Sequence, residues 1–327
     1  MTVPSRRAGG GRLEHTMRIC VFGAGGVGGY FGGLLARSGA DVTFLARGEH
    51  LRALQARGLT LRTVREAFTI PVKATNDPRT VGPVDLVLFC VKSYDTESAG
   101  RALPDLLAPG GAVVSLQNGI DNEQRLEAIL GKGRVLGGAA YIWSTITEPG
   151  VITQTGGACK IAFGELTGSS TERAQRILEV CQRAGFACEL TTNIWKVLWE
   201  KFIFICALGG MTAVTRLPLG EILAAAETRE MFRGIMAEIH ALARAEGVPL
   251  EDDLVPRMVT IAEGLDPAGR SSLSHDLAAG GRLELDALNG KVVELGLRRG
   301  IPTPLNFAVT ACLRPYARGA AGAQANR

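Results

Sequence analysis

Lys201 interrupts an otherwise apolar face of a segment with helical periodicity. The other residues of that face, at i, i+4, i+11 and i+14, are Ile194, Leu198, Ile205 and Leu208. The opposite face is also apolar, so we expect the helix to be buried nearly all round. Burial lowers the pKa of a lysine toward neutrality, which suits a general acid that protonates an oxygen atom. The alternative is a lysine that reaches the surface or pairs with a carboxylate for structure alone.

Glu284 is the carboxylate that we expect to partner Lys201. It stands at the start of a predicted helix with an apolar face formed by Leu285, Leu288, Val292 and Leu295. A single glutamate at a helix start is usually a solvated charge that interacts with the helix dipole. Because spacing alone does not bring Glu284 to Lys201, their pairing is a hypothesis.

Polar side chains follow two predicted strands at the point where each strand ends. The apolar run 84–91 is followed by Lys92, and the run 113–117 is followed by Asn118. Ligands of open α/β sheets bind outside the carboxyl ends of the strands, so Lys92 and Asn118 are candidates to meet a cofactor or substrate. Each of them could instead be an ordinary residue of a surface loop.

A glycine-rich string directly follows the first predicted strand and opens a helix. In this GxGxxG context Gly23 allows a tight turn, Gly25 allows the backbone to approach a pyrophosphate, and Gly28 allows close helix–strand packing. The helix N-terminus adds free N–H groups and a positive dipole end. The predicted dinucleotide contacts are Gly23, Gly25, Gly26, Val27 and Gly28.

Arg47 decides which dinucleotide we expect. It lies just past the second strand, at the carboxyl end, where an arginine favours the 2′-phosphate of NADP(H) and an acid would favour NAD. Asp41 is acidic but stands at the start of that strand, at the wrong end. The sequence therefore predicts NADP(H), with a solvated loop arginine as the alternative.

These residues require an α/β fold. Short apolar strands, of which the first two are predicted at 18–22 and 41–45, are separated by helix-length segments. This pattern predicts an N-terminal Rossmann-type, doubly wound parallel sheet over residues 17–190. Periodic helical segments predict a C-terminal all-α-helical domain over residues 191–318, with the active site in the cleft between the two. Residues 1–16 are expected to form a disordered extension and residues 319–327 a frayed tail.

Composition excludes several classes of protein. An apolar share of 46% and a charged share of 21% argue against disorder, and a net charge of +4 spread along the chain argues against nucleic-acid binding. Seven cysteines without a CxxC pair indicate reduced thiols and a cytoplasmic setting. Histidine spacing indicates no metal site, and the longest apolar run, 202–211, is too short to predict a membrane helix. The apolar helical domain leaves a homodimer open.

The combination of motifs resembles the ketopantoate reductase (2-dehydropantoate 2-reductase) family from about residue 17 to 316. The matching strings are Gly23 to Gly28 with Arg47, Val91-Lys92, Gln117-Asn118-Gly119, Leu198 to Phe202, Ser271-Ser272 with Asp276, and Glu284 to Asp286 with Asn289-Gly290. The resemblance implies NADPH-dependent reduction of a 2-oxo acid, with Lys201 as general acid. It further implies that Glu284 orients Lys201 and binds the hydroxyl, that Ser272 holds the substrate carboxylate, that Asn118 contacts substrate and cofactor, and that Lys92 lies near the nicotinamide.

The chain departs from the family's pattern in the substrate half of the site. Ile205, Gly209 and Gly269 stand where better-known members have asparagines that bind a polar substrate. Lost hydrogen bonds of this kind can change selectivity strongly. Ketopantoate is the first-choice substrate, a more apolar 2-oxo acid or ketone is the alternative, and an NADP-sensing module without catalysis is a third reading.

Overall fold

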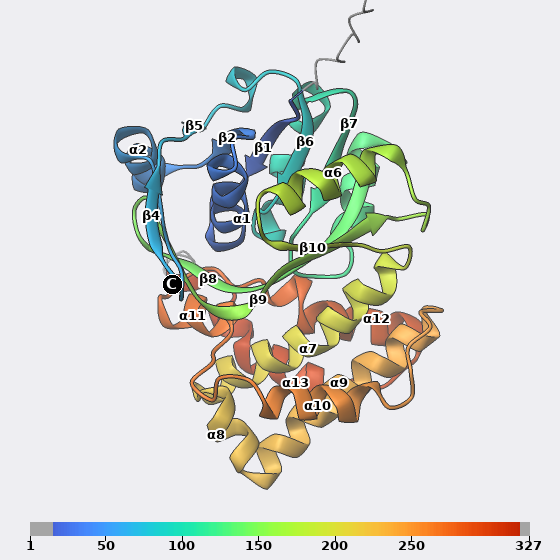
Figure 1. Ribbon diagram of the computed structural model, residues 1–327. Coiled ribbons are helices and arrows are strands. Elements are labelled where there is room, and N and C mark those ends of the chain that lie inside the picture. The colour runs from blue at the N-terminus through green and yellow to red at the C-terminus, as the bar shows by residue number, and fades with distance from the viewer. Residues whose placement is uncertain (1–15, 321–327) are drawn as a thin grey trace, which may run out of the picture.

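The computed structural model describes residues 16–320 and divides into a sheet with flanking helices and a bundle of helices packed beneath it (Figure 1). The predicted extension 1–16 and tail 319–327 fall almost wholly outside the described residues. The strands are β1 (Arg18–Phe22), β2 (Asp41–Leu45), β3 (Leu59–Arg62), β4 (Ala67–Ile70), β5 (Lys73–Thr75), β6 (Val84–Phe89), β7 (Leu107–Ser115), β8 (Val135–Glu148), β9 (Val151–Glu165) and β10 (Ala187–Leu190).

The helices of the sheet domain are α1 (Gly26–Arg37), α2 (Gly48–Arg57), α3 (Thr96–Gly100), α4 (Leu103–Leu106), α5 (Asn122–Leu130) and α6 (Glu172–Arg183). Those of the bundle are α7 (Ile194–Thr215), α8 (Leu219–Ala224), α9 (Ala226–Ala245), α10 (Leu254–Glu263), α11 (Ser272–Ala278), α12 (Asn289–Arg299) and α13 (Pro304–Leu313). Short 3₁₀ turns are η1 (Pro78–Thr80), η2 (Ser93–Asp95), η3 (Leu285–Ala287) and η4 (Arg314–Tyr316).

The parallel half of the sheet is doubly wound, as the sequence predicted. The strand order β7-β6-β1-β2-β5 places β1 in the centre, with the chain winding outward on both sides of it. One face carries α1 and α6 over an apolar cluster that includes Phe31 and Ile177, and the other carries α4 and α5 over a cluster that includes Leu103 and Leu126. These strands are buried on both faces, which explains their nearly unbroken apolar sequences.

The sheet as a whole is mixed, so the prediction of a parallel sheet holds for all but two of the strand pairs among the described residues. Strands β8 and β9 form a long antiparallel hairpin, and β3 pairs antiparallel with β4. The hairpin turns at Pro149-Gly150, where Gly150 has a φ of +85°. A Pro-Gly turn can connect two antiparallel strands directly. Parallel strands instead need a crossover connection, which is usually a helix.

Helix α7 is the axis of the bundle. It contributes Phe202, Ile203 and Cys206, each at most 1% exposed, to an apolar core shared with α9 and α12. By length and composition Ile194–Thr215 is apolar enough to cross a membrane, although the shorter apolar run 202–211 predicts no such helix. Its most apolar window is 67% buried inside the protein, which is the environment of a core helix.

Candidate active site

The strand ends that were predicted to carry function meet at one edge of the sheet. In the parallel register Phe22 lies beside Leu45 and Phe89, and Phe89 lies beside Ser115. The loops after β1, β2, β6 and β7 therefore leave the sheet side by side. The edge lies where the winding reverses at β1 and β6, which is the ligand-binding position of doubly wound sheets.

The glycine-rich loop has the geometry of a dinucleotide cradle. Gly23 has a φ of +104° and makes the turn out of β1, and its Cβ position is filled by the backbone of Cys90. Gly25, which precedes the first turn of α1, has nothing within 4 Å of its Cβ position. Gly28 is buried, and a Cβ there would lie 2.2 Å from the carbonyl oxygen of Gly23. Gly25 thus leaves open space for a pyrophosphate beside the N-terminus of α1, while Gly28 serves packing.

Gly26 and Val27 lie in the same partly exposed turn. A Cβ on Gly26 would lie 2.2 Å from the carbonyl oxygen of Ser144 in β8. The small size of Gly26 is therefore required by the hairpin, which comes close to the start of α1.

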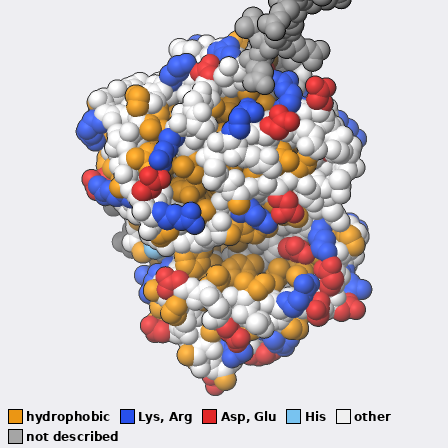
Figure 2. Space-filling model, viewed as in Figure 1, with side chains coloured by type: hydrophobic (Ala, Val, Ile, Leu, Met, Phe, Trp, Pro, Cys, Tyr) orange, Lys and Arg blue, Asp and Glu red, His pale blue; other side chains and the backbone are white. Residues whose placement is uncertain are grey.

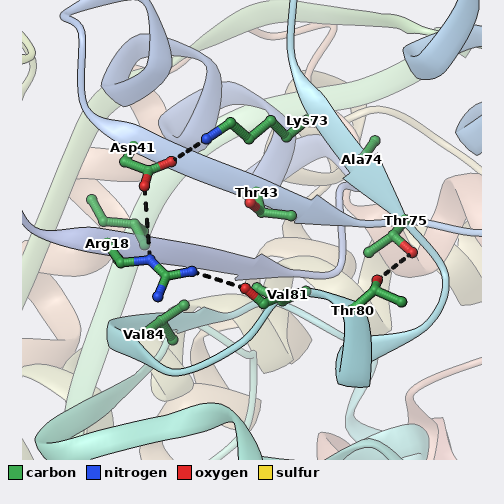
Figure 3. Close-up of a pocket in the computed structure, with 10 residues that line it drawn as sticks. Arg18, Asp41, Thr43, Lys73, Ala74, Thr75, Thr80, Val81 and Val84 are labelled. Atoms are coloured by element: carbon green, nitrogen blue, oxygen red, sulfur yellow. Dashed lines mark hydrogen bonds and ion pairs between the residues drawn. The ribbon is translucent and has the colours of Figure 1, made fainter.

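Arg47 and Asp41 lie at opposite ends of β2. The Arg47 side chain is 73% exposed beyond the carboxyl end, and its nearest charge is Asp95 at 3.6 Å. Asp41 pairs with Lys73 at 2.7 Å and with Arg18 at 3.8 Å, in a cavity of about 260 Å³ at the amino ends of the strands (Figure 3). Asp41 thus stands at the amino end of β2, opposite Arg47, as the sequence predicted.

Lys201 lies on α7, one turn after the fully packed Leu198. Its side chain is in the intermediate range of exposure and, within the described part of the chain, makes no hydrogen bond or ion pair. Burial lowers the pKa of Lys201 to about 8, while the nearby charges of Glu123 and Glu284 act in the opposite direction. An amine with a pKa in this range can give up its proton at physiological pH.

Glu284 lies near Lys201 but is bonded to other groups. Its Oε1 accepts from the Ser93 backbone N–H at 2.8 Å, and its Oε2 lies 3.1 Å from the Nζ of Lys92. Lys92 also contacts Asp276 at 2.7 Å. Burial disfavours the charged lysine, yet Glu284 and Asp276 outweigh this and raise the pKa of Lys92. This cluster joins the end of β6 to the helical domain.

The helix predicted to begin at Glu284 begins instead at Asn289. Glu284 precedes the 3₁₀ turn η3, and the chain reaches α12 only after a break in helical geometry at Leu288. The apolar spacing of residues 285–295 therefore spans two elements that both face the core. This periodicity could not distinguish them from one continuous helix.

Asn118 follows β7 in the sheet domain, and Ser272 begins α11 in the helical domain. The Asn118 backbone oxygen accepts from the Asn122 amide at 3.0 Å, whereas its side chain has no hydrogen-bond partner among residues 16–320. Ser272 is exposed at the start of α11. The preceding Ser271 fixes it, since its hydroxyl is 2.7 Å from that of Thr212 on α7.

Two polar residues to which sequence reasoning assigned no role of their own also belong to this edge. The Gln117 amide donates to the carbonyl of Val91 and to Thr96, which ties the ends of β7 and β6 together. Glu123, in the first turn of α5, is 1% exposed, and burial raises its pKa to about 7. The local sequence around a buried glutamate at a helix start does not differ from the sequence around a solvated glutamate at the same position. Only the fold reveals its burial.

Apolar side chains lie beside the three positions that depart from the family's pattern. A Cβ on Gly269 would lie 2.4 Å from the ring of Trp143, so Trp143 of β8 fills the space of any larger residue there. A Cβ on Gly209 would lie 3.7 Å from Leu273, and Ile205 is partly buried against the helical core. On the face shown in Figure 2, apolar side chains gather where the two domains meet.

Among residues 16–320, no group of three His, Cys, Asp or Glu side chains could hold a metal ion.

A dinucleotide-binding sheet whose carboxyl edge faces an unpaired lysine on a helical domain defines an oxidoreductase that uses a nicotinamide cofactor. The family description "Ketopantoate reductase PanE/ApbA" matches residues 19–168, and its C-terminal counterpart matches residues 193–317. The chain belongs to the ketopantoate reductase family, whose members are oxidoreductases acting on CH–OH groups.

Individual relatives agree with this assignment. The chain is 32% identical to the 2-dehydropantoate 2-reductase of Halobacterium salinarum over 293 residues, which cover 88% of this chain and 95% of the relative. It is 37% identical to a solved PanE/ApbA family ketopantoate reductase from Ralstonia eutropha, with a TM-score of 0.85 and coverage of 92% and 98%. D-mandelate dehydrogenase, at 20% identity, a TM-score of 0.85 and the same coverage, shares the fold.

Proposed function

We propose that the protein reduces a 2-oxo acid with NADPH, with 2-dehydropantoate (ketopantoate) to pantoate, a step of pantothenate biosynthesis, as the first-choice reaction. The observation that carries this proposal is the unpaired Lys201 amine beside the sheet edge, with a pKa lowered by burial to about 8. The exposed Arg47 at the end of β2 supports NADPH over NADH. When bound, NADPH supplies the hydride that reaches the 2-carbon.

The chain's own residues supply the proton and the positioning. The Nζ of Lys201 donates a proton to the carbonyl oxygen as the 2-carbon gains hydride, so that the C=O becomes C–OH, and water returns a proton to the lysine. Ser272 and the free Asn118 side chain bind the substrate's oxygens. Glu284, held by Lys92 and Ser93, presents a fixed negative charge toward Lys201 and the hydroxyl.

Lys201→Met tests this assignment. Loss of the general acid should lower kcat for ketopantoate by about 10²–10⁴-fold. The Kd for NADPH, measured by quenching of protein fluorescence, should stay near that of the wild type. Wild-type kcat/KM should fall above pH 8, because the acid must be protonated and its pKa is about 8. Near-wild-type turnover of the variant would exclude Lys201 as the acid.

The enclosure of Gly269 by Trp143 favours a second candidate function, the reduction of a more apolar 2-oxo acid or ketone. Following NADPH absorbance with ketopantoate and with a panel of alkyl and aryl 2-oxo acids decides between the two. A higher kcat/KM for ketopantoate removes the alternative. Tight NADPH binding without oxidation by any member of the panel would indicate the sensing module.

We further propose a cytoplasmic enzyme that forms a homodimer. The described cysteines are all free, which fits a reducing compartment. The apolar side chains of Leu297 and Phe307, 81% and 60% exposed, lie on the adjacent helices α12 and α13 and offer a surface to a second copy. Sedimentation equilibrium gives the mass in solution, and a monomer at micromolar concentration would refute the dimer.

A further inference from the structure

Trp143 of β8 lies at the boundary between the two domains. Strand β8 contacts both α1 of the sheet domain and α7 of the helical domain. A Cβ on Gly26, at the start of α1, would overlap the carbonyl group of Ser144, the residue after Trp143. The Trp143 indole itself lies against Gly269, two residues before Ser271 in the helical domain. Trp143 therefore lies between the proposed cofactor cradle and the segment proposed to hold the substrate.

A bulge in the β8–β9 hairpin sets the direction of the Trp143 side chain. From Tyr141 to Trp143 the pairing advances two residues along β8 but four along β9, from Lys160 to Gly156. Cys159, inside this bulge, has a φ of 50°, in the left-handed region that residues other than glycine rarely adopt. Strained backbone persists only where the surrounding structure imposes it, and β-bulges often re-aim a side chain next to an active site.

Three glycines leave room for the indole. A Cβ on Gly156 would lie 3.2 Å from ring atom Cε3 of Trp143, and a Cβ on Gly157 would lie 3.0 Å from the Trp143 backbone nitrogen. A Cβ on Gly269 would overlap the far edge of the ring. The indole is nevertheless only partly buried, and its N–H makes no hydrogen bond within residues 16–320. The ring is thus held in place without being covered, as are the aromatic side chains that line ligand pockets.

The helical domain adds further side chains without hydrogen-bonding groups. Ile205 and Gly209 follow Lys201 by one and two turns of α7, and Ile205 is partly buried against the helical core. Gly209 lies beside Leu273, the residue after Ser272, which is 2% exposed. An oxygen on the substrate's carbon side chain would lose water at such a surface without gaining a partner, whereas an alkyl or aryl group gains by burial.

We propose that Trp143 is a specificity-determining residue, whose indole forms the wall against which the carbon side chain of the 2-oxo acid packs. The preferred substrates then carry a bulky alkyl or aryl group. This inference rests on the proposed reduction of a 2-oxo acid and deepens it by naming the residue that selects the substrate. The carboxylate and carbonyl common to all 2-oxo acids stay with Ser272 and Lys201, so Trp143 takes no part in proton transfer.

Trp143→Ala removes the wall, and 2-oxo acids with different side chains report the loss. For phenylpyruvate and 4-methyl-2-oxopentanoate, kcat/KM should fall by about 10–100-fold, because even one methylene in an apolar pocket is worth about 10–200-fold. For pyruvate, whose methyl group offers little surface to the ring, kcat/KM should change little. Trp143→Phe should show the same pattern with a smaller loss, and it carries the test if Trp143→Ala does not fold.

The matched control is Ile146→Ala, which truncates a 41% exposed side chain further along β8 and should affect no substrate. Thermal unfolding establishes that each variant is folded. Equal losses for all three substrates would mean that Trp143 only supports the fold, and unchanged values for all three would mean that the indole does not touch the substrate. Either result would overturn the proposal.

A binding measurement separates this proposal from the proposed function. If no 2-oxo acid oxidises NADPH, the proposed function fails, and phenylpyruvate is then titrated calorimetrically into the NADPH complex. Weaker binding to Trp143→Ala than to the wild type and Ile146→Ala would support the wall. Equal binding to all three proteins, or no binding to the wild type, would overturn it.

Discussion

Two lysines of this site lie in opposite electrostatic environments. Lys92 is held by two carboxylates, which raise its pKa despite its burial, and so it stays charged. Lys201 has no bonded partner, and burial lowers its pKa to about 8. The first lysine is suited to hold its neighbours and attract anionic groups. The second is suited to give up a proton.

At the level of single residues, Arg47→Ala should change the choice of cofactor. A hydrogen bond to a charged group contributes about 1.5–3 kcal/mol, so the Kd for NADPH should rise by about 10–100-fold. The Kd for NADH, which has no 2′-phosphate, should change little. Fluorescence titration with both cofactors gives the ratio. Equal losses for the two would mean that Arg47 does not contact the 2′-phosphate.

The candidate residues that the sequence could predict are those with a local signature. The glycine string, Arg47 and Lys201 each stand out from their immediate neighbours, and the structure places all of them at the same edge or facing it. The bonds of Glu284 to Lys92 and Ser93 span about 190 residues of chain, and no local pattern encodes them. The same holds for Glu123, whose burial depends on the packing of α5 against β8 and its neighbouring helices.

At the level of elements, two glycines of the turn into α1 should respond oppositely to alanine. Gly28→Ala would place a Cβ 2.2 Å from the Gly23 carbonyl oxygen and should destabilise the fold by about 1–3 kcal/mol. Gly25→Ala meets no protein atom within 4 Å and should cost less than about 1 kcal/mol.

Binding of NADPH separates the two variants further. Gly25→Ala should raise the Kd by about tenfold or more, because its methyl group occupies the space proposed for the pyrophosphate. Calorimetric titration and thermal unfolding of both variants check this pair of outcomes. A stable Gly25→Ala protein with wild-type affinity would show that the pyrophosphate lies elsewhere.

Elements that repeat a simple pattern were predicted well from sequence. The strands predicted at 18–22 and 41–45 have the same bounds as β1 and β2. Short apolar runs bounded by glycine or charged residues leave little choice of where a strand begins and ends. The hairpin partner β9 was missed, since residues 151–165 contain glycines, threonines and a lysine without regular alternation. Its position is decided by pairing with β8, in which the register shifts several times, and with β3, which lies far earlier in the chain.

At the level of the whole molecule, the cluster of Lys92, Asp276 and Glu284 holds the two domains together. Lys92→Met would leave Glu284, which is 6% exposed, without its cation and should cost about 1–3 kcal/mol. The unfolding temperature should fall by a few degrees. Arg62→Gln, which breaks an exposed pair with Glu148, is the control and should have almost no effect. Equal effects of the two substitutions would show that the cluster does not stabilise the domain arrangement.

The first turns of α7 are attached to the sheet domain. Ile194 and Leu198 cover Gly137 of β8, and the Trp195 ring nitrogen donates to the carbonyl of Leu166. If the domains rotate about this attachment, α7 acts as a lever. At 1.5 Å per residue, Lys201 lies about 10 Å from the pivot at Ile194, and Thr212 lies about 27 Å from it. Lys201 would then move less than half as far as the Ser271–Ser272 segment bonded to Thr212, so the proposed proton donor would stay near the sheet edge while the segment proposed to hold the substrate swings.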